Sequence, residues 1–179
     1  VRYIDLSAIL PGGSTFEHPG LYSVKCDEVN LTLQGEVERV QALSLPPVRG
    51  TVRVIEGQYE RHWQELVKEW FDREADVQFE VWADYPIMRH LRFDLDVVAP
   101  NNFWVVSDFG KLKIEASIDG KILGRIQRPV FAGRIDLLPQ SEFSLYTFEY
   151  PFVIQEGSYV ENSSSLEFNP RYEIYAKTA

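Results

Sequence analysis

The sequence predicts a mainly β protein, a β-sandwich or barrel of roughly nine strands with one flanking α-helix. Three observations lead to this fold class. Apolar and polar residues alternate in several short segments, as they do in strands that bury one face. Aromatic residues make up 13% of the 179-residue chain, which favours strands. Residues 58–72 instead follow the 3.6-residue period of an amphipathic helix.

The first third of the chain is predicted to form strands separated by proline and glycine. Residues 1–10 open with a mixed apolar run, and a glycine-rich loop follows at residues 11–15. Gly35 suggests a bulge or turn inside the second of the alternating segments, which Pro46 and Pro47 end because proline cannot donate to a ladder. Strands are therefore predicted at residues 21–26, 30–40 and 51–55.

The predicted helix spans residues 58–72. Its apolar stripe consists of Tyr59, Trp63, Leu66, Val67, Trp70 and Phe71. Charged side chains occupy the opposite face, Gly57 is an acceptable N-cap, and no proline interrupts the run. Two tryptophans on one stripe need a wide partner surface, so we expect this helix to pack against the sheet.

The remainder of the chain again reads mainly as strands. They are predicted at residues 77–82, 91–97, 103–106, 112–118, 131–138 and 141–154. Asp119-Gly120 predicts a two-residue hairpin turn, with the returning strand beginning at Lys121. Residues 155–170 are polar and serine-rich, which predicts a long exposed loop, and Tyr172 and Ile174 suggest a strand added to a sheet edge.

The length favours a single domain, residues 1–179, with an N-terminal segment at 1–17 and an exposed C-terminal arm at 155–179. Eighteen basic and 27 acidic residues give a net charge of -9, which argues against a surface that grips nucleic acid by neutralising phosphates. No apolar stretch approaches the ~20 residues of a membrane span, and no signal peptide pattern opens the chain. We expect a protein made in a cytoplasm.

No enzyme signature or metal motif emerges from the sequence. Cys26 is the only cysteine, so an internal disulfide is excluded, and a buried, inert thiol is expected. Together with His18, His62 and His90 it leaves no zinc pattern. Residues 12–15 lack the lysine of a phosphate-binding loop. We expect no catalytic residue, metal or cofactor.

Asp94 and Asp96 are the one pair of residues for which the sequence also suggests a catalytic or calcium-binding role. They lie two apart in a strand and so share a face, and with Glu80 or Glu115 opposite they suggest a glycosidase carboxylate pair or a calcium site. The simpler interpretation, which we favour, is that they form the solvated side of an amphipathic strand.

The order of several short motifs carries a resemblance. A His18-Pro19 turn precedes an alternating strand, an Ala-x-x-Leu-Pro segment lies within residues 42–47, and Trp63 and Trp70 mark the charged amphipathic stretch. Pro129 and Gly133 then frame a short apolar run before a Thr-Phe-Glu-Tyr segment at 147–150. In this order, over residues 18–157, the chain resembles the tail tube proteins of contractile bacteriophages, which are related to the inner tubes of contractile injection systems.

That resemblance implies a structural virion protein that forms or initiates the hollow inner tail tube through which DNA passes. It implies copies of the chain in a ring, hexameric in this family, with stacked rings and with tail sheath or baseplate proteins as further partners. Assembly would occur in the host cytoplasm, without a membrane. Residues 84–109 and 158–179 have no counterpart, so both a repeating subunit and a tube-initiating or terminating protein remain open.

The resemblance also assigns roles to particular residues. Acidic side chains that line the lumen would let DNA pass without specific binding. The candidate lumen-facing acids are Glu80, Asp94, Asp96 and Glu115, which alternate with apolar residues. The candidate contacts between rings are Leu45, Pro46 and Pro47, together with residues 155–170.

Two other function classes stay open from the sequence. One is a carbohydrate-binding or cell-surface-binding β-sandwich, which the many aromatic residues would suit. The other is a small hydrolase or ligand-binding barrel, for which Asp94 and Asp96 would be the acidic groups.

Overall fold

The computed structural model describes residues 2–18, 22–39, 43–61, 90–107, 112–125, 128–139, 141–144, 150–167 and 169–178. The elements in these ranges are strands. They are β1 (Arg2–Leu10), β2 (Thr15–His18), β3 (Tyr22–Cys26), β4 (Val29–Arg39), β5 (Leu43–Ser44), β6 (Val48–Arg61), β7 (Arg92–Ser107), β8 (Leu112–Arg125), β9 (Arg128–Leu137), β10 (Glu142–Phe143), β11 (Phe152–Ile154), β12 (Tyr159–Asn162), β13 (Arg171–Glu173) and β14 (Ala176–Thr178).

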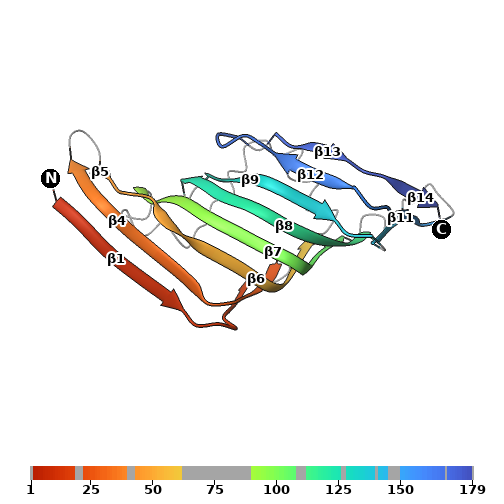
Figure 1. Ribbon diagram of the computed structural model, residues 1–179, viewed down its shortest axis with the longest axis horizontal. Helices are drawn as coiled ribbons and strands as arrows, with labels where there is room; N and C mark the ends of the chain where they lie inside the picture. The colour runs from red at the N-terminus through yellow and green to blue at the C-terminus, as the bar shows by residue number, and fades with distance from the viewer. Residues whose placement is uncertain are drawn as a thin grey trace.

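These strands form one open sheet of 14 strands, so the mainly β prediction is confirmed. Its central path runs β1-β4-β6-β7-β8-β10-β11-β14. Branches β2-β3 and β9-β12-β13 join β6 and β8. Figure 1 shows β1 along one border of the sheet and β13 and β14 along the opposite border. The strands outnumber the roughly nine predicted, and those described form neither a second packed sheet nor a closed barrel.

Each strand presents alternate residues to two different faces of the sheet. On one face, here called the apolar face, the buried cluster comprises Cys26, Val29, Val54, Val97, Ala99 and Ile118. A second buried cluster of Ile114, Leu137 and Ile154 lies where β8, β9 and β11 meet. The opposite face, here called the charged face, carries Arg49, Asp94, Asp96 and Lys121, which join in ion pairs. The alternation at 91–97 and 112–118 is therefore confirmed.

The predicted turn at Asp119-Gly120 is wrong, because β8 runs through both residues without a break. Gly120 lies between Val97 of β7 and Gly133 of β9. A Cβ at Gly120 would lie 2.6 Å from the Phe131 ring and 2.7 Å from the Ala132 carbonyl oxygen. The glycine is thus required by the close approach of β9 and not by a turn, and a period-two pattern cannot distinguish these two uses.

The predicted helix at 58–72 is wrong over its first four residues, which extend β6. Tyr59 pairs with Tyr22 of β3 on one side and with Val105 of β7 on the other. Tyr59 fits the helical stripe, but it also alternates with Gln58 and Glu60 as a strand residue does, and pairing on both sides decides between the two periods. The rest of that helix, residues 62–72, and the predicted strand at 77–82 lie outside the described residues.

Two irregularities keep the apolar face continuous along the longest strands. In β6, one additional residue lies between Val54 and Glu56 relative to β3. In β7, the register with β8 shifts between Ala99 and Phe103, at a bulge that includes Asn102 with φ of 58°. Beyond these points Gly57 lies opposite Phe103, and a Cβ on Gly57 would meet the Phe103 ring at 2.6 Å. Both strands therefore keep apolar residues on one face on either side of the bulges.

The C-terminal part differs from the prediction. The single strand predicted at 141–154 is wrong, because β10 and β11 are two strands that pair antiparallel with each other. Residues 159–162, placed in a long exposed loop by their polarity, form β12, which pairs with β9. The predicted edge strand is confirmed for Tyr172, which lies in β13 beside Val160 of β12, while Ile174 lies between β13 and β14. Gly35, predicted as a bulge or turn, pairs with Ile4 inside an unbroken β1–β4 ladder.

Candidate functional site

The outer edge of β1 is the first candidate surface. Among the described strands β1 pairs with β4 alone, over all nine of its residues. Its large apolar side chains face solvent, and the exposed fractions are 68% for Tyr3, 60% for Leu6 and 66% for Ile9. The strand carries no lysine or proline, the residues that commonly protect an edge from pairing with another chain.

The second candidate surface is the edge formed by residues 171–178, called here the C-terminal edge. It comprises β13, beside β12, and β14, beside β11, joined by Ile174 and Tyr175. All of its residues are exposed, and Tyr172, Ile174 and Tyr175 are large and apolar. Figure 1 shows β13 and β14 following one another along the border opposite β1.

Ser158 holds the centre of the C-terminal edge in place. Ser158 is 1% exposed, and its hydroxyl accepts a hydrogen bond from the Tyr175 backbone N–H at 2.9 Å. Its hydroxyl oxygen lies 2.9 Å from the Gln155 carbonyl and 3.2 Å from the Tyr175 carbonyl, and its single proton is donated to these acceptors. The Gln155 N–H donates to the Tyr175 carbonyl at 2.8 Å. The edge therefore exposes its side chains while its backbone is fixed.

Asn162 is a second buried polar residue that sequence reasoning missed. Its side chain is 2% exposed, and its amide donates to the carbonyls of Phe131, Ser164 and Glu167 while accepting from the Asn169 N–H. The loop after β12 is built around this amide, yet it presents Leu166 with 90% of its area exposed. A polar residue near the end of a strand is the only sequence signal for this role.

Replacing Asn162 with alanine is expected to lower the free energy of unfolding by about 1–3 kcal/mol, because buried carbonyls lose their donors. Urea denaturation measures the difference. Ser163→Ala is the matched control, since that side chain is exposed in the same loop, and a change within about 0.5 kcal/mol is expected. Equal stability of the two variants would show that water replaces the amide.

Asp94 and Asp96 lie on the charged face as predicted, but each has a cationic neighbour. Lys121 Nζ lies 2.8 Å from Asp96 Oδ1 and 3.6 Å from Asp94 Oδ1, and Arg49 Nε lies 3.4 Å from Asp94 Oδ2. The hydrogen bond to Asp96, supported by the charges of both aspartates, raises the pKa of Lys121 above its ordinary value. These two acids are thus offset by two cations and do not form a purely acidic patch.

Ion pairing continues further along the same face. Arg134 Nε lies 2.7 Å from Asp136 Oδ1, and the Arg134 guanidinium stacks 3.9 Å above the centre of the Tyr159 ring. The hydrogen bond to Asp136 raises the pKa of Arg134. Partial burial, followed by the charge of Glu173, raises the pKa of Tyr159. Positive and negative groups are therefore interleaved across the charged face.

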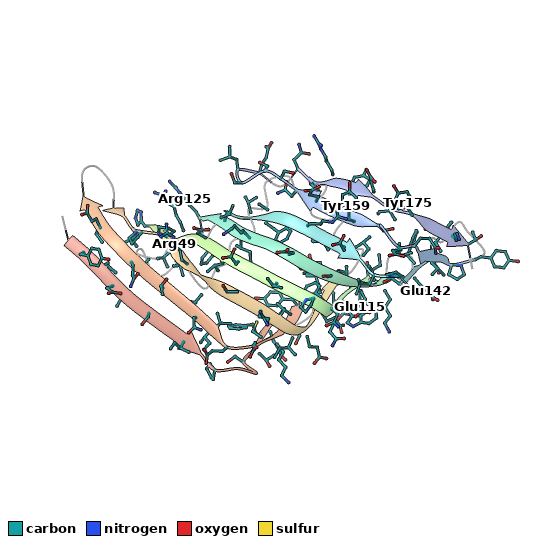
Figure 2. The ribbon with its side chains drawn as sticks, viewed as in Figure 1. Arg49, Glu115, Arg125, Glu142, Tyr159 and Tyr175 are labelled. Atoms are coloured by element: carbon teal, nitrogen blue, oxygen red, sulfur yellow. The ribbon has the colours of Figure 1, made fainter. Side chains whose placement is uncertain are left out.

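Glu115 lies on the charged face but far from Asp94 and Asp96. Asp96 is opposite Lys121 on β8, and Glu115 is six positions further along that strand, which at ~3.4 Å per residue is about 20 Å. Figure 2 shows Glu115 and Arg49, the partner of Asp94, near opposite ends of the strands. Glycosidase carboxylates are separated by about 5–9.5 Å. Glu115 and the two aspartates therefore do not form such a pair.

Glu115 instead closes the bulge in β7. Its Oε1 accepts a hydrogen bond of 3.0 Å from the Asn102 backbone N–H. Its backbone N–H donates to Ser141 Oγ at 2.9 Å, and its carbonyl accepts from the Leu138 N–H at 2.8 Å. Glu80, the fourth candidate acid, lies outside the described residues.

The predicted inter-ring loop lies beside β4. Leu45 is only 6% exposed, so its side chain has little surface to offer another subunit, while Pro46 and Pro47 are half-buried. A Cβ at Gly35 would lie 3.0 Å from Pro46 Cβ, so the proline ring uses the space that this glycine leaves. Whether Pro46 and Pro47 contact another ring stays a prediction.

Within the described ranges, no group of three or more His, Cys, Asp or Glu side chains is placed to hold a metal ion. Cys26 is buried as predicted, and this burial raises the pKa of its thiol. In the same part of the chain, no helix has the length and apolar character to cross a membrane. No protein-family model, curated protein or solved structure matches the chain.

Proposed function

We propose that this chain is a structural subunit that associates with copies of itself into rings, and that these rings form or initiate the hollow tube of a virion tail through which DNA passes. The observation that carries the proposal is the open sheet, whose borders at β1 and at the C-terminal edge are both exposed and each carry three large apolar side chains.

An exposed strand edge presents N–H and C=O groups that can pair with another chain. Soluble monomers commonly block such edges with charges, prolines or bulges, but β1 pairs evenly with β4 and exposes Leu6 on the apolar face and Tyr3 and Ile9 on the charged face. Burying three large apolar side chains contributes about 1.5–3 kcal/mol each. Such an edge is better suited to a subunit contact than to solvent.

Two different edges at opposite borders favour a ring. A contact between unlike surfaces is repeated from copy to copy, and it closes into a ring when the rotation per copy allows it. The predicted hexamer, the stacking of rings, and contacts with sheath or baseplate proteins belong to this proposal. The sandwich or barrel expected from the sequence would then be completed by neighbouring copies.

The charge of the chain supports the passage of DNA. The net charge is -9, and the charged face offsets Arg49 and Lys121 with Asp94 and Asp96. Phosphates release bound counterions only where unpaired cations neutralise them. A lumen lined by this face would repel DNA or have no net attraction for it, so that DNA could slide through without specific binding.

Light scattering after size-exclusion chromatography, combined with negative-stain microscopy, tests the proposal. We expect rings or tubes of the purified chain, and we expect Leu6→Lys with Ile9→Lys to yield monomers, because the added charges make pairing at β1 unfavourable. Ile55→Lys is the matched control, since Ile55 is exposed on β6, away from both edges. A chain that stays monomeric at every concentration overturns the proposal, and monomers that bind glycans would instead support a carbohydrate-binding module.

A further inference from the structure

The two exposed edges are matched in length. β1 has nine residues, Arg2–Leu10, and the C-terminal edge extends over residues 171–178. Each carries three large exposed apolar side chains, Tyr3, Leu6 and Ile9 on β1 and Tyr172, Ile174 and Tyr175 on the other edge. Either edge is long enough to cover most of the other with main-chain hydrogen bonds.

The two edges also run in the same direction. Along the path from β1 to β14, the pairs β1–β4, β4–β6, β7–β8, β8–β10, β10–β11 and β11–β14 are antiparallel, and β6–β7 is parallel. The direction is therefore reversed an even number of times. The route through β9 and β12 to β13 leads to the same result. In Figure 1 the arrows of β1 and β14 point the same way.

This common direction determines how copies related by rotation can join. When the rotation axis lies roughly along the strands, as in a closed barrel, every copy keeps its strand direction. β1 of one copy then meets the C-terminal edge of the next as a parallel neighbour. Pairing of β1 with β1 across a two-fold axis would instead be antiparallel.

The faces of the two edges restrict the register. On β1, Leu6 is opposite Leu33 and Leu10 packs against the buried cluster, so even-numbered residues are on the apolar face. On the C-terminal edge, Ala176 is opposite Ile154, which is 1% exposed in the second cluster. Even-numbered residues of both edges therefore share the apolar face.

The charged face is compatible with the same alignment. Asp5 is the acidic residue of β1 and lies on the charged face, where it accepts a 2.8 Å hydrogen bond from Gln34. Arg171, Glu173 and Lys177 share that face on the C-terminal edge, because odd-numbered residues there lie opposite the charged-face positions of β12 and β11. The Glu173 carboxylate accepts a 3.0 Å hydrogen bond from the Tyr175 hydroxyl, and the two cations outnumber this acid. An alignment of even with even residues thus places cations on the same face as Asp5, where opposite charges favour pairing.

We infer that β1 of one copy adds as a parallel strand to the C-terminal edge of a second copy, with the even-numbered residues of both strands on one continuous apolar face. This inference rests on the proposed self-assembly and specifies which two edges form the contact between copies, called here the joint. Each contact joins two different edges, β1 on one copy and the C-terminal edge on the next, so assembly proceeds head to tail. In a closed ring both of these edges would be paired.

Disulfide cross-linking of the full chain tests the joint. Leu6→Cys is combined, one at a time, with Ile174→Cys, Ala176→Cys or Thr178→Cys, and in a second series with Glu173→Cys, Tyr175→Cys or Lys177→Cys. Neighbouring strands lie ~4.8 Å apart, within the Cα separation of a disulfide, and only residues on the same face can be bridged. The native Cys26 is buried and will not compete.

We expect at least one variant of the even-numbered series to yield a ladder of covalent multimers on oxidation, while the odd-numbered series and Leu6→Cys alone remain uncross-linked. Cross-linked dimers from Leu6→Cys alone would show that β1 pairs with itself. A ladder from the odd-numbered series alone, or oligomers without any cross-link, would likewise overturn the joint while leaving self-assembly intact. Absence of oligomers by light scattering would instead refute the proposed function.

Discussion

Replacing Ile154 with alanine is expected to lower the free energy of unfolding by about 2–5 kcal/mol, the range for large-to-small changes in a protein core. Ile154 is 1% exposed and forms one buried cluster with Ile114 and Leu137, against which Ile135 and Phe143 pack. The loss combines the transfer of the removed carbon atoms to water with the cavity that remains. Since native domains are stable by about 5–15 kcal/mol, this one change removes a large part of the total.

Urea denaturation followed by tryptophan fluorescence measures the effect, at one fixed protein concentration because assembly adds to apparent stability. Ile55→Ala is the control, since Ile55 is 44% exposed in the β6 bulge. We expect its effect to stay below about 1 kcal/mol. A loss for Ile154→Ala as small as that of the control would show that the second cluster contributes little to the fold.

Replacing Gly133 with alanine is expected to cost about 2–6 kcal/mol, because two penalties coincide there. Its φ of +154° is a conformation that side-chain-bearing residues rarely adopt, at about 1–3 kcal/mol. The added Cβ would also meet the Gly120 backbone and the Asp119 carbonyl oxygen, and overpacking of this kind costs about 1–3 kcal/mol.

Two further glycines separate these penalties. Gly157 has φ of +89° with only the Tyr175 ring near a Cβ, at 3.9 Å, so Gly157→Ala reports the backbone term alone. Gly120 has no positive φ but is crowded by Phe131, so Gly120→Ala reports the steric term. The denaturation midpoint of Gly133→Ala should be lower than the midpoints of both Gly157→Ala and Gly120→Ala. If Gly133→Ala is no worse than Gly157→Ala, β8 and β9 separate easily at this point.

The strand content was predictable because alternation is a local property. Leu95 and Val97 alternate with Asp94 and Asp96, and any sheet with one buried face would place them as observed. The predicted turn at Asp119-Gly120 failed for the opposite reason. The need for a glycine there comes from Phe131, a residue of another strand, and no window around Gly120 contains that information.

The candidate surfaces were only partly predictable. The alternation around Asp94 and Asp96 predicted their face, but their ion pairs depend on Arg49 and Lys121, which come from two other strands. The C-terminal strand β13 was recognisable from Tyr172, although Ile174 lies just beyond its end. The exposed edge at β1 was not, because its apolar residues resemble those of a buried strand until the missing neighbour is known.

The bulges in β6 and β7 also determine where the chain tolerates a change in length. A single-residue deletion within 48–52 would turn the following residues, as far as the bulge at Ile55, to the opposite face and place Arg53 among the core residues. At Ile55 or at Asn101, where one strand already has additional residues relative to its neighbour, the ladder is locally interrupted and gains or losses can be absorbed. Insertions and deletions in related chains are thus expected to gather at these two points, while the segments between them keep a constant number of residues.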